Sequence, residues 1–125
     1  MTSRKAARRA ALFILYQWDI TGEPLASLYE GEIDPFTRDL VDGVAAAAEE
    51  LDQRVTEAAV GWPAERLGTL ERNVLRIGLF ELDRGDVPAP VAIDEAVRLA
   101  KRYASEDAAR LVNGILGRLE KERAA

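Results

Sequence analysis

Apolar side chains recur at a spacing of three or four residues along nearly the whole sequence. An α-helix turns once in about 3.6 residues and collects such positions on one face, whereas a half-buried strand alternates apolar and polar residues. The sequence shows no sustained alternation of that kind. We therefore predict an all-α protein, in which the buried face of the first helix carries Ala7, Ala11, Ile14, Leu15 and Trp18.

Residues that start or end helices divide this pattern into segments. Ser3 and Ser105 are predicted N-caps, because a hydroxyl oxygen can accept a hydrogen bond from a free N–H group of the first turn. Asp34 followed by Pro35 is a further start signal, since proline has no N–H group to leave unpaired at the first helical position. After the first helix, the predicted helices cover residues 25–29, 36–58, 70–82, 93–103 and 106–119.

Three of these segments carry more specific expectations. One apolar stripe continues over residues 36–58, so this helix should run unbroken until the Gly-Trp-Pro sequence at 61–63. Residues 70–82 are apolar nearly all round, which is typical of a helix in the middle of a domain. Gly114 and Gly117 lie inside the last helix, where close packing against another helix is the expected reason for glycine.

Length and composition narrow the classes of function. With 125 residues, 48% of them hydrophobic and 31% charged, the chain is expected to form one domain over residues 1–125. We find no long apolar span and no secretory signal, so we expect a cytoplasmic protein. Cysteine and histidine are absent, which removes thiolate nucleophiles, imidazole bases and the usual zinc ligands. We expect no enzymatic activity, no cofactor and no metal site; a carboxylate enzyme using Asp94 or Glu95 is the least favoured alternative.

The net charge of −5 opposes a polyanionic partner, but the charges are unevenly distributed. Before Asp19 there is no acidic residue, and the basic residues are Arg4, Lys5, Arg8 and Arg9. At about 100° per residue, Arg4 and Arg8 flank the apolar stripe, and the face away from it carries Lys5, Arg9, Leu12 and Tyr16. Cations beside an aromatic ring suit single-stranded nucleic acid, although a solvated basic face is the common alternative for such a pattern.

The turn into the last helix is a second candidate surface. A helix N-terminus can hold a phosphate group, but Glu106 and Asp107 in the first turn would repel it. These two carboxylates interact favourably with the helix dipole, so a capped helix start is the simpler interpretation. Arg110 and Asn113 lie about one turn further on, so their side chains remain available for contact with RNA.

Three segments of the second half resemble the NusB family closely: RNVLRIGLFEL at 72–82, DVPAPVAIDEAVRLAK at 86–101 and LVNGIL at 111–116. The basic N-terminal run that leads to LYQW at 15–18 resembles the first helix of these proteins. The matches follow one another in the family's order over nearly the whole chain. The resemblance is to a stand-alone NusB, since the catalytic domain that follows a NusB-like module in some ribosomal RNA methyltransferases is not recognisable.

The resemblance implies a fold of about seven helices in two packed helical bundles. It also implies transcription antitermination, in which boxA RNA of ribosomal RNA transcripts is bound together with NusE, a small-subunit ribosomal protein, within an RNA polymerase antitermination complex. Family positions that contact RNA match Arg4, Lys5, Arg8, Arg110, Leu111 and Asn113. Family positions that face NusE match Tyr16 and Glu71, with Arg72 and Arg76 nearby, and a position that tunes RNA affinity matches Asp107.

Besides the carboxylate enzyme, the sequence leaves a second competing function open, and it departs from the family at the contact position Leu111. Leu111 stands where many NusB proteins have phenylalanine, so apolar contact replaces base stacking at that position. A homodimeric helical adaptor that binds proteins and no RNA would also use Tyr16 and Glu71. Affinity for RNA that falls with salt would distinguish the RNA-binding protein from such an adaptor.

Overall fold

The computed structural model describes residues 3–59, 61 and 67–124, and these residues form seven helices and no strand. In chain order the helices are α1 (Arg4–Thr21), α2 (Leu25–Leu28), α3 (Pro35–Ala46), α4 (Ala48–Ala58), α5 (Thr69–Arg84), α6 (Ala89–Tyr103) and α7 (Glu106–Ala124). The prediction of an all-α protein is therefore confirmed. In this part of the chain we find no helix with the length and apolar character needed to cross a membrane.

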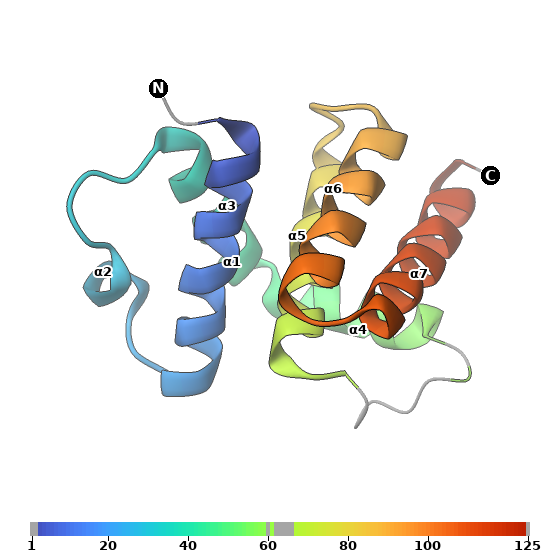
Figure 1. Ribbon diagram of the computed structural model, residues 1–125, viewed down its shortest axis with the longest axis horizontal. Helices are drawn as coiled ribbons and strands as arrows, with labels where there is room; N and C mark the ends of the chain where they lie inside the picture. The colour runs from blue at the N-terminus through green and yellow to red at the C-terminus, as the bar shows by residue number, and fades with distance from the viewer. Residues whose placement is uncertain (1–2, 60, 62–66, 125) are drawn as a thin grey trace.

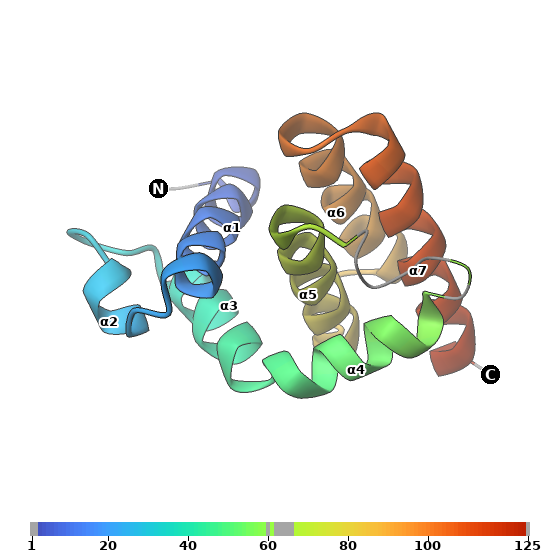
Figure 2. The same cartoon turned by 90° about the horizontal axis from the view of Figure 1, so that it is seen from below.

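Helix α5 lies in the middle of the molecule, where it packs against α1, α3, α4, α6 and α7. Residues 73–79 of this helix are all buried, as its nearly all-round apolar sequence predicted. Helices α1, α2 and α3 form one group and α4 to α7 form a second, as Figures 1 and 2 show. This arrangement agrees with the two bundles that the family resemblance implied.

The predicted N-caps hold the starts of three helices. The Ser3 hydroxyl accepts a hydrogen bond from the N–H group of Ala6 at 3.1 Å, and the Ser105 hydroxyl accepts one from Ala108 at 3.0 Å. The Asp34 carboxylate accepts from the N–H group of Phe36 at 2.9 Å, with proline at the first helical position. A cap of this kind contributes about 1 kcal/mol to helix stability, so these helix starts are specified locally.

The predicted helix over residues 36–58 is broken at Ala47, so the expectation of one continuous helix is wrong. Ala47 has φ −105° and ψ 9° and separates α3 from α4. The reason is tertiary, because α3 packs against α1 and α5 whereas α4 packs against α5 and α7. The chain bends around α5 at this point, as Figure 2 shows. The breakers Trp62 and Pro63 lie outside the described residues.

Close packing occurs at two glycines other than those the sequence singled out. A Cβ atom added at Gly114 or Gly117 would meet no atom within 4 Å, so the predicted role of these glycines in helix packing is wrong. By contrast, a Cβ atom at Gly78 of α5 would lie 2.6 Å from the Leu116 Cδ1 atom of α7. At Gly43 of α3 the added atom would overlap the Phe80 ring.

Candidate nucleic-acid interface

Several Lys and Arg side chains on α1 and at the end of α6 have no carboxylate partner within the described residues. Most of the Lys and Arg side chains in residues 3–59, 61 and 67–124 form ion pairs with Asp or Glu. The exceptions within these residues, all exposed, are Arg4, Lys5, Arg9, Arg38, Arg102 and Lys121. Three of them lie in the first two turns of α1 and one in the last turn of α6, so part of the predicted basic surface of α1 is accessible.

An exposed aromatic contact joins α1 to α6 beside these cations. The ring of Phe13 is 43% exposed and meets the ring of Tyr103 edge to face, with 5.0 Å between the centroids and 78° between the planes. Figure 1 shows that the turn between α6 and α7 faces α1. The contact brings an aromatic surface together from helices that are far apart in the sequence.

The phenol oxygen of Tyr103 accepts a hydrogen bond from one guanidinium group and is influenced by the charge of a second. The Arg102 Nε atom donates a hydrogen bond to this oxygen at 3.3 Å, and the Arg102 Cζ atom lies 5.6 Å from the ring centroid. Desolvation raises the pKa of Tyr103, but the hydrogen bond from Arg102 and the positive charges of Arg102 and Arg9 outweigh that effect, and the pKa is lowered. The positive charges of Arg9 on α1 and Arg102 on α6 therefore both act on Tyr103.

Arg8 is not part of this accessible charge. Its side chain is 4% exposed, and its Nε atom lies 2.9 Å from the Glu81 Oε2 atom of α5, with further hydrogen bonds to Glu81 Oε1. Glu95 of α6 lies 3.8 Å from the Arg8 Nη1 atom. The sequence placed Arg8 beside the apolar stripe and predicted contact with RNA; the structure turns it inward, because α5 and α6 present carboxylates there. We therefore leave Arg8 out of the interface.

Two leucines that were expected at the RNA surface are buried. Leu12 is 0% exposed, because α1 packs against both α3 and α5 and so buries more than one stripe. Leu111 is 5% exposed and belongs to the hydrophobic core. The expected position of Leu12 on the open face is therefore wrong, and the predicted apolar contact of Leu111 with RNA does not fit this packing.

The other predicted RNA-contacting residues of α7 lie on the surface. Arg110 and Asn113 are exposed, and Asn113 follows Arg110 by about one helical turn. The Arg110 guanidinium is ion-paired with Asp107 in the first turn of α7. A phosphate group that binds Arg110 would therefore compete with the Asp107 carboxylate.

The residues predicted to face NusE divide into accessible and internal groups. Tyr16 of α1 and Glu71 of α5 are half-buried. Arg76 is 5% exposed and binds the Asp52 carboxylate at 2.6 Å and 2.7 Å, so its predicted contact with a partner does not fit this packing. Arg72 keeps 37% of its side chain exposed while its Nη2 atom lies 3.1 Å from Asp19. This ion pair places the second half of α1 beside the first turn of α5.

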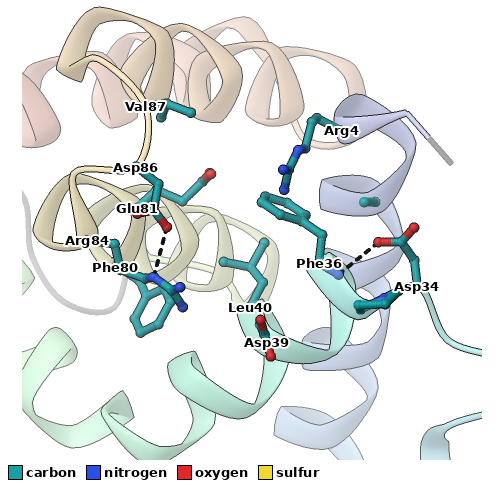
Figure 3. A pocket seen from close by; sticks show the side chains of 12 residues that line it. Arg4, Asp34, Phe36, Asp39, Leu40, Phe80, Glu81, Arg84, Asp86 and Val87 are labelled. Atoms are coloured by element: carbon teal, nitrogen blue, oxygen red, sulfur yellow. Dashed lines mark hydrogen bonds and ion pairs between the residues drawn. The ribbon is translucent and has the colours of Figure 1, made fainter.

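A cavity of about 530 Å³ opens where the N-terminal ends of α1 and α3 meet the C-terminal end of α5 (Figure 3). The Arg4 Cζ atom lies 4.0 Å from the centroid of the Phe36 ring, and Arg84 lies over Phe80 at 5.6 Å. The carboxylates in the lining are those of Asp34, Asp39, Glu81 and Asp86. These carboxylates outnumber the lining cations and would repel a phosphodiester chain, so we exclude the cavity from the candidate interface and keep only its exposed Arg4.

The described residues contain no group of three or more His, Cys, Asp or Glu side chains arranged to hold a metal ion. Of the two carboxylates considered for acid–base chemistry, Glu95 binds Arg98 at 2.6 Å and also faces Arg8, which is a structural role. Asp94 is exposed.

The sequence interpretation missed Phe13, Arg102 and Tyr103. A signal existed for Phe13, because Lys5, Arg9 and Phe13 are spaced four residues apart and therefore share one face of α1. The periodicity of α6 gave no comparable signal for Tyr103. Its position beside Phe13 depends on how α1 and α6 both pack against α5, which local periodicity does not report.

Comparisons with known proteins give one consistent result. Residues 5–121 match the model of the NusB family. The transcription antitermination protein NusB of Solibacter usitatus is 40% identical, over 98% of this chain and 91% of that protein. The NusB of Rubrobacter xylanophilus is 41% identical, over 91% of this chain and 87% of that protein.

Solved structures agree with the sequence relatives. A crystal structure of the antitermination factors NusB and NusE in complex with dsRNA matches with a TM-score of 0.81 and 32% identity, over 95% of this chain and 96% of that one. A chain in the crystal structure of a plectonemic RNA supercoil matches with a TM-score of 0.87 and 32% identity, over 100% of this chain and 99% of that one.

Proposed function

This chain belongs to the NusB family, and from that premise we propose that it is a transcription antitermination factor. In this proposal it binds boxA RNA of ribosomal RNA transcripts together with NusE, and the complex acts with RNA polymerase to keep transcription processive. The protein works by assembly and not by catalysis, as a single RNA-binding domain over residues 1–125 in the cytoplasm. Its relatives carry the name of antitermination proteins, and one structural neighbour is a complex of NusB, NusE and RNA.

The observation that carries the proposal is the concentration of uncompensated cations on one part of an anionic protein. The net charge is −5, yet Arg4, Lys5 and Arg9 on α1 and Arg102 on α6 are exposed and have no carboxylate partner in the described residues. Such cations can neutralise phosphates and release counterions on binding. Phosphate contacts of this kind orient the strand, while base contacts set the sequence preference.

Helix α7 extends this interface with one adjustable contact. Arg110 and Asn113 are exposed, and Asp107 holds the Arg110 guanidinium in an ion pair. We expect the Asp107→Asn variant to bind RNA more tightly, because Arg110 would be free for phosphate and one repulsive charge would be lost. Unchanged or weaker affinity in this variant would contradict the role of Asp107 as the affinity-tuning residue.

For NusE we propose a separate surface on the second half of α1 and the start of α5. Tyr16 is half-buried, and Ile20, four residues later on α1, keeps 56% of its surface exposed, which is high for a large apolar residue. Glu71 and the accessible part of Arg72 lie beside this region through the Arg72–Asp19 ion pair. Arg76 is not included, because it is buried in the interior.

A salt series on RNA binding tests the proposal. Affinity for unpaired boxA RNA is measured against a scrambled strand and a duplex, with and without NusE. Lys5→Ala and Arg4→Ala should each weaken binding and reduce the slope of log affinity against log salt by about 0.7. Lys121→Ala is the matched control, because Lys121 is also exposed and without a carboxylate partner in the described residues, but lies near the end of α7.

Two outcomes would reject the proposal. Equal effects of Lys121→Ala and Lys5→Ala would show that binding reports only overall charge. Binding of NusE without any salt-dependent affinity for RNA, together with a dimer in sedimentation, would instead support the homodimeric adaptor.

A further inference from the structure

The exposed aromatic contact between α1 and α6 has no role in the phosphate contacts described above. In the described residues the large apolar side chains with high exposure are Phe13, Ile20 and Val91. Phe13 differs from the other two because its ring contacts a second aromatic ring, that of Tyr103. We propose that Phe13 and Tyr103 form an aromatic platform on which an unpaired RNA base stacks, between phosphates held by Arg9 and Arg102. This inference rests on the proposed function.

The geometry of the pair leaves ring surface available. The two rings meet at 78°, so the edge of one ring faces the other, and the ring that offers its edge keeps both of its own faces clear of its partner. Phe13 is 43% exposed, so the platform is not enclosed in the core. A base has a flat apolar face of similar size, and stacking on such rings tolerates any base.

The charges around the platform select a polyanionic occupant. Arg102 donates a hydrogen bond to the Tyr103 hydroxyl, and Arg9 lies one helical turn before Phe13 on α1. Both cations are exposed, and neither has a carboxylate partner in residues 3–59, 61 and 67–124. Lys5 precedes Arg9 by one turn on the same face of α1, so a line of cations leads to the platform. An aromatic surface between cations matches a single strand, in which bases and phosphates alternate along the chain.

The platform also supplies a contact that α7 does not. Leu111 is 5% exposed, so the predicted RNA-contacting position of α7 presents no apolar surface to a base. Arg110 and Asn113 offer polar contacts on that helix. Stacking in this protein would therefore fall to Phe13 and Tyr103.

The test measures binding of unpaired boxA RNA to the full chain at one salt concentration and across a salt series. Phe13→Ala and Tyr103→Leu should each weaken binding by roughly 5- to 150-fold, the range for losing one stacked base. Neither change removes a charge, so the salt slope should stay at the parent value, in contrast to the flattening expected for Lys5→Ala.

Further variants separate stacking from effects on the fold. Tyr103→Phe and Phe13→Trp keep a ring and should retain affinity, while Val91→Ala, at an exposed apolar position of α6, should leave it unchanged. RNA that carries 2-aminopurine should lose fluorescence on binding to the parent, and this quenching should disappear in Phe13→Ala. Duplex RNA, whose bases are already stacked, should bind the parent and Phe13→Ala equally.

The results distinguish failure of the platform from failure of the proposed function. If Lys5→Ala flattens the slope while Phe13→Ala and Tyr103→Leu bind as tightly as the parent, the platform is rejected and the RNA-binding function stands. If Phe13→Ala loses NusE and not RNA, the surface is a protein contact and the platform is again rejected. If the parent shows no salt-dependent RNA binding, both are rejected.

Discussion

Replacing Arg8 by alanine should damage the fold far more than it alters RNA binding directly. The Arg8 side chain is 4% exposed and its guanidinium forms hydrogen bonds of 2.9 to 3.1 Å with both carboxylate oxygens of Glu81. Glu95 lies 3.8 Å away on another helix. Removal of Arg8 leaves the Glu81 carboxylate, itself 8% exposed, without its partner.

The size of the effect follows from this burial. Breaking a buried ion pair by removing one partner costs about 3–5 kcal/mol, because the remaining charge is desolvated and uncompensated. Total stabilities of native domains are about 5–15 kcal/mol, so Arg8→Ala should lose a large part of the free energy of unfolding. Replacing the pair together, as Arg8→Met with Glu81→Leu, should recover much of that loss, since Arg98 still pairs with Glu95.

Urea unfolding followed by circular dichroism measures these free energies. The control is Arg118→Ala, because Arg118 pairs with Glu122 at 3.3 Å while both side chains are at least half exposed, and it should change stability by no more than about 0.5 kcal/mol. If Arg8→Ala unfolds at the parent's urea concentration and loses RNA affinity, then Arg8 is free in solution and the argument from burial is refuted.

Two further predictions concern packing and pH. Gly78→Ala should destabilise the protein by about 1–3 kcal/mol, because its Cβ would lie 2.6 Å from a Leu116 methyl carbon. Gly114→Ala adds its Cβ in open space on a helix and should stabilise the protein by up to about 1 kcal/mol. Urea unfolding of both variants measures the two changes in free energy. Burial and a hydrogen bond to Asp42 raise the pKa of Tyr29 from 10.0 to about 12. The folded state therefore keeps this proton to higher pH than the unfolded chain, so the associated stability is present below pH 10 and is lost as the pH rises through about 12. Phenolate absorbance against pH should show the raised pKa. Unfolding of the parent and of Tyr29→Phe against pH should show the loss of stability in the parent only.

Helix starts and the accessible stripe of α1 could be read from neighbouring residues. Ser3, Asp34 and Ser105 cap the helices that they were predicted to cap, because a cap depends on hydrogen bonds spanning two or three residues. The spacing of Lys5 and Arg9 places both on one face of α1 wherever that helix packs. These features are local, so the sequence by itself determined them.

Contacts between distant segments decided the rest. Arg8 turns inward because Glu81, 73 positions later in the chain, meets it across the α1–α5 packing, and Tyr103 reaches Phe13 because α1 and α6 both pack against α5. The bend at Ala47 follows from packing around α5 in a run of good helix formers. Helical periodicity reports which residues share a face, but the charge of the neighbour that a face meets depends on the tertiary arrangement. For that reason the sequence could propose the basic surface of α1, and only the folded protein could show which of its cations reach solvent.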